Sequence, residues 1–154
     1  MSYSPAYTQA IAITVCISAQ NILRDRPWVS AASLSETLGI PKPTVVNITS
    51  RLVSAGLLES KEGKNGGLRF CKSPSQVNLL HIMEAIERKR SLFHTDLAAK
   101  ANRPEINDAR RIVLSCFQSA EKSMKHALAE VTIDHFIRHH RQKRDQCRKT
   151  TENR

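Results

Sequence analysis

Apolar side chains dominate the first helical stretch of the chain, which extends from residue 5 to residue 24. Pro5 opens this stretch and the polar run RDRP ends it. Because isoleucine and valine fall on most sides of the predicted helix, we expect it to be buried or shared with a second subunit.

Two shorter helices are predicted next. The first, AASLSETL, follows Ser30, a favourable N-cap, and ends at Gly39, a favourable C-cap. The second, IPKPTVVNITSRLVSAG, is closed by Gly56. Its prolines stand in or before the first turn, where a missing N–H costs nothing.

The pattern then changes from helical to extended. Two short runs, LLESK and GLRFCK, flank a glycine-rich tip and predict a β-hairpin. SPSQVNLLHIMEAIERK predicts another amphipathic helix, and residues 91–105 show no regular pattern. A long helix is predicted after Pro104, followed by a short one in TIDHFIRHH. From Arg141 onward the chain is basic without periodicity, which predicts a disordered tail.

Composition narrows the function classes. The 154 residues carry a formal charge of +10 with a pI near 9.9. Self-repulsion of this size opposes compaction, so the charge alone fits either a polyanionic partner such as nucleic acid or a merely soluble basic protein. No apolar run approaches the roughly 18 residues of a membrane helix. The four cysteines are widely separated, so a disulfide framework is not expected, and we expect a cytoplasmic protein without membrane contact.

The hairpin tip admits two interpretations. EGKNGGLRF contains three of the five glycines between basic residues, which suits a phosphate-binding loop of an enzyme or a hairpin that presents cations to a polyanion. A P-loop needs GxxxxGK[ST] followed by a helix. Here the spacing is GxxGG, no Ser or Thr follows a Lys, and a strand comes next. The sequence favours the hairpin.

A helix, a tight turn, a helix and a hairpin in this order predict a winged helix-turn-helix, a mainly α fold with a small β-wing. One face of the second helix is expected to bury Val45, Ile48 and Leu52, while the opposite face enters the major groove of DNA. Asn47 and Thr44 are candidates for base edges. The wing glycines are expected to allow close approach to phosphates. Phosphate or minor-groove contacts are expected from Lys42, Arg51, Lys61, Lys64, Asn65 and Arg69.

The chain resembles the Rrf2 family of bacterial winged-helix transcription regulators. The motifs that carry the resemblance are LGI followed by P, RLVSAGLL, the wing GKNGG, and NLLHIMEAIE. The resemblance implies a homodimer joined by the long helix and bound to a pseudo-palindromic operator. By position it places the start of the recognition helix and the wing tip at Pro41, Lys42, Pro43, Thr44, Asn47, Lys64, Asn65 and Gly66. The dimer helix carries its apolar residues at Ile106, Val113, Phe117, Ala120, Met124 and Leu128.

These expectations divide the chain into three parts. They are a DNA-binding domain in residues 1–90, a loop and dimerisation helix in residues 91–140, and a basic tail in residues 141–154.

The sequence differs from many members of the family in the loop that binds their iron–sulfur cluster. Many relatives bind an iron–sulfur cluster through three cysteines in the loop before the dimer helix, but residues 91–105 contain no cysteine, so no cofactor is expected. Redox roles for Cys71 and Cys116 are left open beside purely structural ones. His135 and His139 have the i, i+4 spacing of metal ligands, yet their basic surroundings favour a surface patch, and no metal site is expected.

Two hypotheses remain from different classes. The first is a homodimeric DNA-binding repressor of the cytoplasm, with an unidentified small-molecule effector left open. The alternative is a winged-helix adaptor that binds protein and does not read DNA. An enzyme has little support, because no acid–base pair, nucleophile triad or metal motif stands out.

Overall fold

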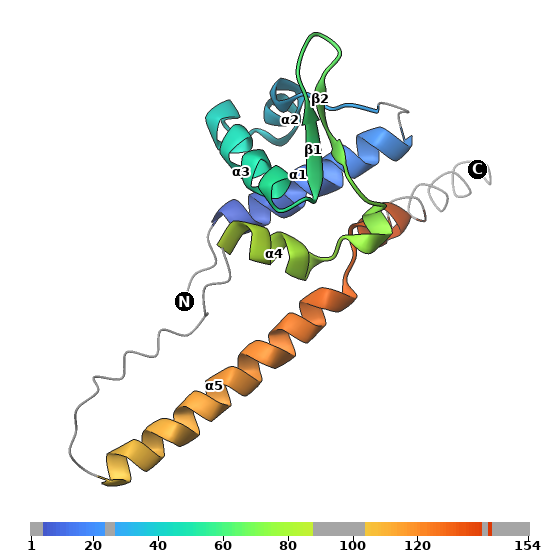
Figure 1. Ribbon diagram of the computed structural model, residues 1–154. Coiled ribbons are helices and arrows are strands. Elements are labelled where there is room, and N and C mark those ends of the chain that lie inside the picture. Colours follow the sequence, from blue (N-terminus) through green and yellow to red (C-terminus); the bar gives the residue numbers. More distant parts are fainter. Residues whose placement is uncertain (1–4, 24–26, 88–103, 140–141, 143–154) are drawn as a thin grey trace, which may run out of the picture.

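The computed structural model describes residues 5–23, 27–87, 104–139 and 142 (Figure 1). Three helices pack beside a two-stranded hairpin, a fourth helix lies beneath them, and a long helix extends away from this body (Figure 1). The elements in chain order are α1 (Pro5–Leu23), α2 (Ala31–Leu38), α3 (Lys42–Ser54), β1 (Leu58–Lys61), β2 (Gly67–Phe70), the 3-10 turn η1 (Pro74–Gln76), α4 (Leu79–Glu87) and α5 (Pro104–Glu130). Residues 133–139 form a further short helix, as the sequence predicted.

The caps of α2 and α3 lie where the sequence placed them. The hydroxyl of Ser30 accepts a hydrogen bond from the backbone N–H of Ser33 at 3.1 Å, and Gly39 ends α2 in the left-handed region at φ 64. After α3, the N–H of Leu57 donates to the carbonyl of Leu52 at 3.0 Å. This bond is typical of a Schellman cap and turns the chain into the first strand of the wing.

The wing is an antiparallel pair with Leu58 opposite Phe70 and Lys61 opposite Gly67. A third segment extends this sheet. Val29 and Leu68 exchange backbone hydrogen bonds of 3.0 and 2.8 Å, so the residues just before α2 lie along the outer edge of β2. The wing is thereby tied to the start of the helix-turn-helix.

A single aliphatic core holds the winged domain together. As expected, Val45, Ile48 and Leu52 of α3 are buried in it, and α1 is buried along most of its length. Ile133 also joins this core and Ile137 is buried as well, although the sequence assigned both to the dimerisation segment. The short helix after α5 therefore returns to complete the body of the domain beside η1 (Figure 1).

The helix predicted from SPSQVNLL begins later than expected. Pro74–Gln76 forms only a 3-10 turn, and Val77 is extended, because its carbonyl accepts a hydrogen bond of 2.8 Å from the N–H of Ile133. Asn78 then caps α4, since its side-chain oxygen accepts from the N–H of His81 at 2.9 Å. A contact with a distant part of the chain thus sets the boundary.

The long helix α5 has no buried residue among its 27 positions. Met124 and Leu128, near its C-terminal end, pack partly against the core, and the rest of the helix extends away from the domain (Figure 1). No helix in the described ranges is long and apolar enough to cross a bilayer. The irregular segment predicted for residues 91–105 lies outside the described residues up to residue 103, and so does the predicted tail apart from residue 142.

Candidate nucleic-acid interface

The outward face of α3 presents polar side chains to solvent. Lys42 and Asn47 are exposed and Thr44 is half-buried, while Val45 on the opposite side is fully buried. Val46 is 49% exposed beside Asn47 and adds an apolar contact point to this face. Pro41 precedes the helix as its N-cap residue and Pro43 follows in the first turn, both exposed. The recognition helix is therefore fixed by its buried face and leaves its polar face free for a ligand.

Arg51 has a different partner from the one expected. Its guanidinium donates a hydrogen bond of 3.2 Å to the carbonyl of Ile86, in the last turn of α4. A cation at this position satisfies a carbonyl that the helix cannot pair and interacts favourably with the helix dipole. This hydrogen bond gives Arg51 a role in the packing of α3 on α4, and the phosphate contact expected from it stays a prediction.

The wing tip carries cations that remain accessible. Lys61, Lys64 and Asn65 are exposed, and Lys64 forms no ion pair within the described ranges. Gly66 and Gly67 are required for an internal reason. A Cβ on Gly66 would lie 2.1 Å from the carbonyl oxygen of Lys61, and one on Gly67 would lie 2.7 Å from the backbone of Val29. Both glycines therefore give clearance to the chain's own backbone, and the clearance expected toward phosphates stays a prediction.

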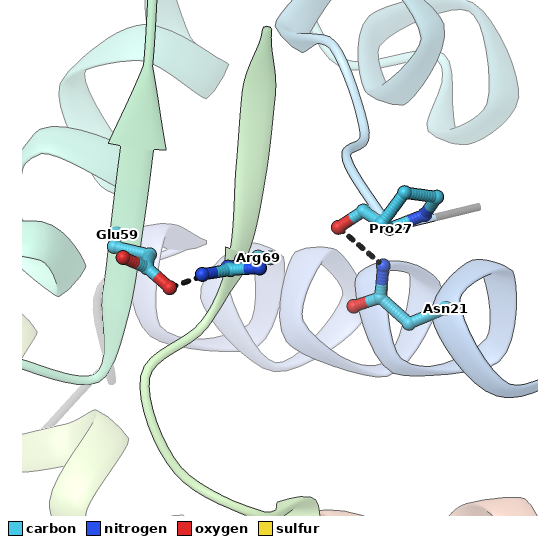
Figure 2. Close-up of polar contacts among 4 residues, drawn as sticks. All are labelled: Asn21, Pro27, Glu59 and Arg69. Atoms are coloured by element: carbon cyan, nitrogen blue, oxygen red, sulfur yellow. Dashed lines mark hydrogen bonds and ion pairs between the residues drawn. The ribbon is translucent and has the colours of Figure 1, made fainter.

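Arg69 is also engaged within the protein. Figure 2 shows its guanidinium on β2 directed at the carboxylate of Glu59 on β1, with which it forms an ion pair. Its guanidinium carbon also lies 4.4 Å from the centre of the Trp28 ring, and the ammonium of Lys61 lies 5.8 Å from the same ring. Arg69 therefore braces the wing against the segment before α2, so a direct phosphate contact is not what this geometry favours.

Trp28 is a site residue that the sequence interpretation missed. It stands beside Val29, and the side chain of Asn21 on α1 holds the preceding Pro27 by a hydrogen bond of 3.2 Å to its carbonyl (Figure 2). The signal was available, because Trp28 is the only tryptophan and WV has high strand propensity. The local sequence does not show which segment Val29 pairs with, because that partner, Leu68 on β2, is distant in the chain.

A polar hollow lies between the wing tip and the start of α2. Its volume is about 360 Å³. The lining residues come from α1, the segment before α2, the first turn of α2 and the wing tip, namely Gln20, Pro27, Trp28, Val29, Ser30, Ser33, Lys64, Asn65 and Gly66. The hollow thus adjoins three of the wing residues named from the sequence, Lys64, Asn65 and Gly66.

The cysteines of the described residues lie on separate elements. Cys16 is half-buried on α1, while Cys71 after β2 and Cys116 on α5 are exposed. Within the same residues no group of three His, Cys, Asp or Glu side chains could hold a metal ion, and this includes the exposed His135 and His139.

The surface of α5 shows an apolar stripe. Ile106 and Val113 are 49% and 37% exposed, Ala120 is exposed, and Phe117 is half-buried. Large apolar side chains in solvent along one helix are typical of an interaction surface. The structure therefore brings these residues together on one side of α5, as the helical spacing predicted.

The comparison with known families decides the identity of the fold. The Rrf2 family model, described as an iron-dependent transcriptional regulator, matches residues 4–139. The chain belongs to the Rrf2 family. This confirms the resemblance found in the sequence, and the family is one of transcriptional regulators rather than enzymes.

Individual Rrf2 relatives agree with this placement. The HTH-type transcriptional regulator IscR of Cereibacter sphaeroides is 31% identical over 71 residues, so the match spans 46% of this chain and 46% of that relative. Among solved structures, T. potens IscR has a TM-score of 0.66 at 17% identity, covering 90% of this chain and 87% of that one. CymR of B. subtilis, titled the global cysteine regulator, has a TM-score of 0.65 at 16% identity, covering 88% and 95%. These likenesses confirm the winged-helix fold.

Proposed function

We propose that the chain is a sequence-selective DNA-binding regulator of the cytoplasm, which acts as a homodimeric repressor on a pseudo-palindromic operator. The observation that carries the proposal is the pairing of an exposed polar face on α3 with a cationic wing tip beside it. Membership of the Rrf2 family supports the same function.

The exposed residues of α3 divide into two roles. The side-chain amide of Asn47 is suited to hydrogen bonding with adenine, and the hydroxyl of Thr44 serves either kind of base edge. Val46 offers an apolar contact for the methyl group of thymine. Lys42 lies at the N-terminal end of the helix, where a phosphate interacts with both its ammonium and the helix dipole.

The wing supplies the flanking contacts. Lys61 and Lys64 neutralise phosphates, and Asn65 at the tip hydrogen-bonds the minor groove or the backbone. Because Arg51 and Arg69 are held by Ile86 and Glu59, they fix the positions of α3 and the wing instead.

Dimerisation through α5 gives the operator its symmetry. The helix has no buried position among its 27 residues and carries an apolar stripe on one side, which is the pattern of a helix that packs against a partner. Pairing two such helices buries the stripe and presents two recognition helices. To read successive major grooves on one side of the duplex, these helices must lie about 34 Å apart.

Sensing by a thiolate-held iron–sulfur cluster is not part of the proposal. The family description names iron, but Cys16, Cys71 and Cys116 stand on different elements and residues 91–105 contain no cysteine. We propose instead that the regulator responds to its signal without such a cluster.

Binding to genomic fragments tests the function. The protein is titrated with its own genomic DNA and with random duplexes, and selected fragments are sequenced. A regulator enriches a two-fold symmetric sequence and its affinity falls with salt, because phosphate contacts release counterions. Asn47→Ala should reduce the preference for the selected site over random DNA, while Gln118→Ala on the exposed surface of α5 serves as the matched control.

Two outcomes would contradict the proposal. An adaptor that does not read DNA shows no preferred sequence at any salt concentration. For the repressor role, the selected site is placed in a reporter promoter, and expression is compared with and without the protein. Unchanged or higher expression in the presence of the protein would overturn repression.

A further inference from the structure

The hollow between the wing tip and α2 contains a buried polar group with spare hydrogen-bonding capacity. Gln20 on α1 lines the hollow and is only 7% exposed. In the described part of the chain its amide makes one hydrogen bond, from Nε2 to Cys16 Sγ at 3.5 Å. Sulfur is a weak acceptor, and buried side-chain amides are normally well satisfied, so the amide oxygen and the second N–H of Gln20 remain for a ligand.

The start of α2 borders the hollow through Ser30 and Ser33, whereas Ala31 and Ala32 are not among its lining residues. The Ser30 cap occupies the N–H of Ser33, whereas the N–H groups of Ala31 and Ala32 have no acceptor in the described residues. These donors stand at the positive end of the helix dipole. The hydroxyls of Ser30 and Ser33 line the same hollow.

The third wall is the wing tip, which supplies a full positive charge. Lys64 lines the hollow together with Asn65, and both are exposed. The ammonium of Lys64, the side chains of Ser30 and Ser33 and the buried amide of Gln20 line one space. A cation with polar donors beside it is the chemistry that binds an oxyanion. The volume of about 360 Å³ lies at the lower end of small-molecule pockets, so it suits a molecule of amino-acid size.

We propose that this hollow binds a small anionic metabolite through its carboxylate or phosphate group, and that the bound anion competes with the duplex for Lys64 and Asn65. The site itself follows from the geometry alone, whereas the competition rests on the proposed DNA-binding function. Because the coupling is reciprocal, DNA must weaken anion binding by the same factor. The hollow is then the input through which the regulator senses its signal.

An oxyanion at this position has two sources, a free anion or a backbone phosphate of the bound DNA. Trp28 distinguishes them, because it is the only tryptophan and lines the hollow. Its fluorescence is titrated with inorganic phosphate and with citrate in the absence of DNA, against sodium chloride at equal ionic strength. A saturable change with either anion and none with chloride is expected.

Variants of Gln20 and Ser33 test whether the change in Trp28 fluorescence comes from an anion bound in the hollow. Gln20→Met keeps the length and shape of the side chain and removes its amide, so it should weaken anion binding about tenfold or more, consistent with loss of a bonded group. Ser33→Ala removes one hydroxyl on the opposite wall, keeps the backbone N–H, and should weaken it several-fold. Circular dichroism verifies the fold of both.

The competition is measured on the selected operator. Phosphate should raise the Kd for DNA about tenfold more than chloride does at equal ionic strength, a typical coupling. In Gln20→Met the two salts should act alike, with the Kd in chloride unchanged, because Gln20 is not part of the DNA contact surface.

Three results would overturn the inference. The first is that neither anion changes the Trp28 fluorescence while DNA still does. The second is that the anions change the fluorescence equally in wild type and in Gln20→Met. The third is that the anion binds but the Kd for DNA stays at its value in chloride. In the first case the hollow serves only the DNA backbone. If instead the anion binds but no duplex does, the DNA-binding function fails and the site stands.

Discussion

Arg51 on the recognition helix donates a hydrogen bond to the carbonyl of Ile86, in the last turn of α4. The 3.2 Å contact joins residues that are 35 positions apart in sequence and connects α3 with the C-terminal end of α4. The orientation of α3 is therefore set from beneath by α4 as well as by the apolar core.

Replacing Arg51 with Ala should lower stability without altering phosphate contacts. Loss of a charge-assisted hydrogen bond to a helix C-terminus costs about 1–2 kcal/mol, which urea unfolding measures. The slope of log K against log salt for DNA binding should stay as in wild type. Lys64→Ala is the contrasting variant, since removing one phosphate contact reduces the magnitude of that slope by about 0.9. A reduced slope in Arg51→Ala would restore the phosphate role.

Alanine substitutions at Gly67 and Gly63 distinguish the effect of a steric clash from that of backbone strain. Both have positive φ, 147 and 100, but only at Gly67 would a Cβ meet another segment, at 2.7 Å from Val29. Gly63→Ala should cost about 1 kcal/mol from strain alone, and Gly67→Ala about 2–3 kcal/mol because overpacking is added.

Hydrogen exchange locates the effect of that clash. The amides of Val29 and Leu68, which bond each other's carbonyls, should lose protection in Gly67→Ala and keep it in Gly63→Ala. If the amides of Val29 and Leu68 were equally protected from exchange in both variants, the Val29 segment would accommodate the added Cβ by shifting together with the wing.

Much of the fold could be predicted from sequence because its signals are local. The caps at Ser30 and Gly39 and the hairpin tip depend on residues within a few positions of one another. Partners distant in sequence left no such signal. The sequence predicts only phosphate contacts for Arg51 and Arg69, because the positions of Ile86 on α4 and of the Trp28 ring are fixed by packing.

Ser18 carries a buried hydroxyl that nothing in the described residues satisfies. The residue is fully buried on α1, and its Oγ has no hydrogen-bond partner there. Ser18→Ala should therefore raise the free energy of unfolding by about 1 kcal/mol, because an unsatisfied buried polar atom is removed with little loss of volume.

A neighbouring threonine provides the control for Ser18. The hydroxyl of Thr14 is equally buried but donates to the carbonyls of Ala10 and Ile11 at 3.0 and 2.9 Å. Thr14→Val should give no comparable gain in a urea titration. Destabilisation by Ser18→Ala would indicate an ordered water that bonds the hydroxyl.

One substitution in the apolar stripe of α5 tests the proposed dimer. Val113 is 37% exposed and contributes nothing to the core of its own chain, so Val113→Lys should leave the unfolding of the winged domain unchanged. It should nevertheless give a monomer in sedimentation equilibrium, because pairing through the stripe would bury an unpaired ammonium among apolar side chains. Ser115→Lys lies about 200° further around the helix and should remain dimeric. If Val113→Lys sediments as a dimer while operator affinity persists, the stripe is not the interface and the half-sites are joined elsewhere.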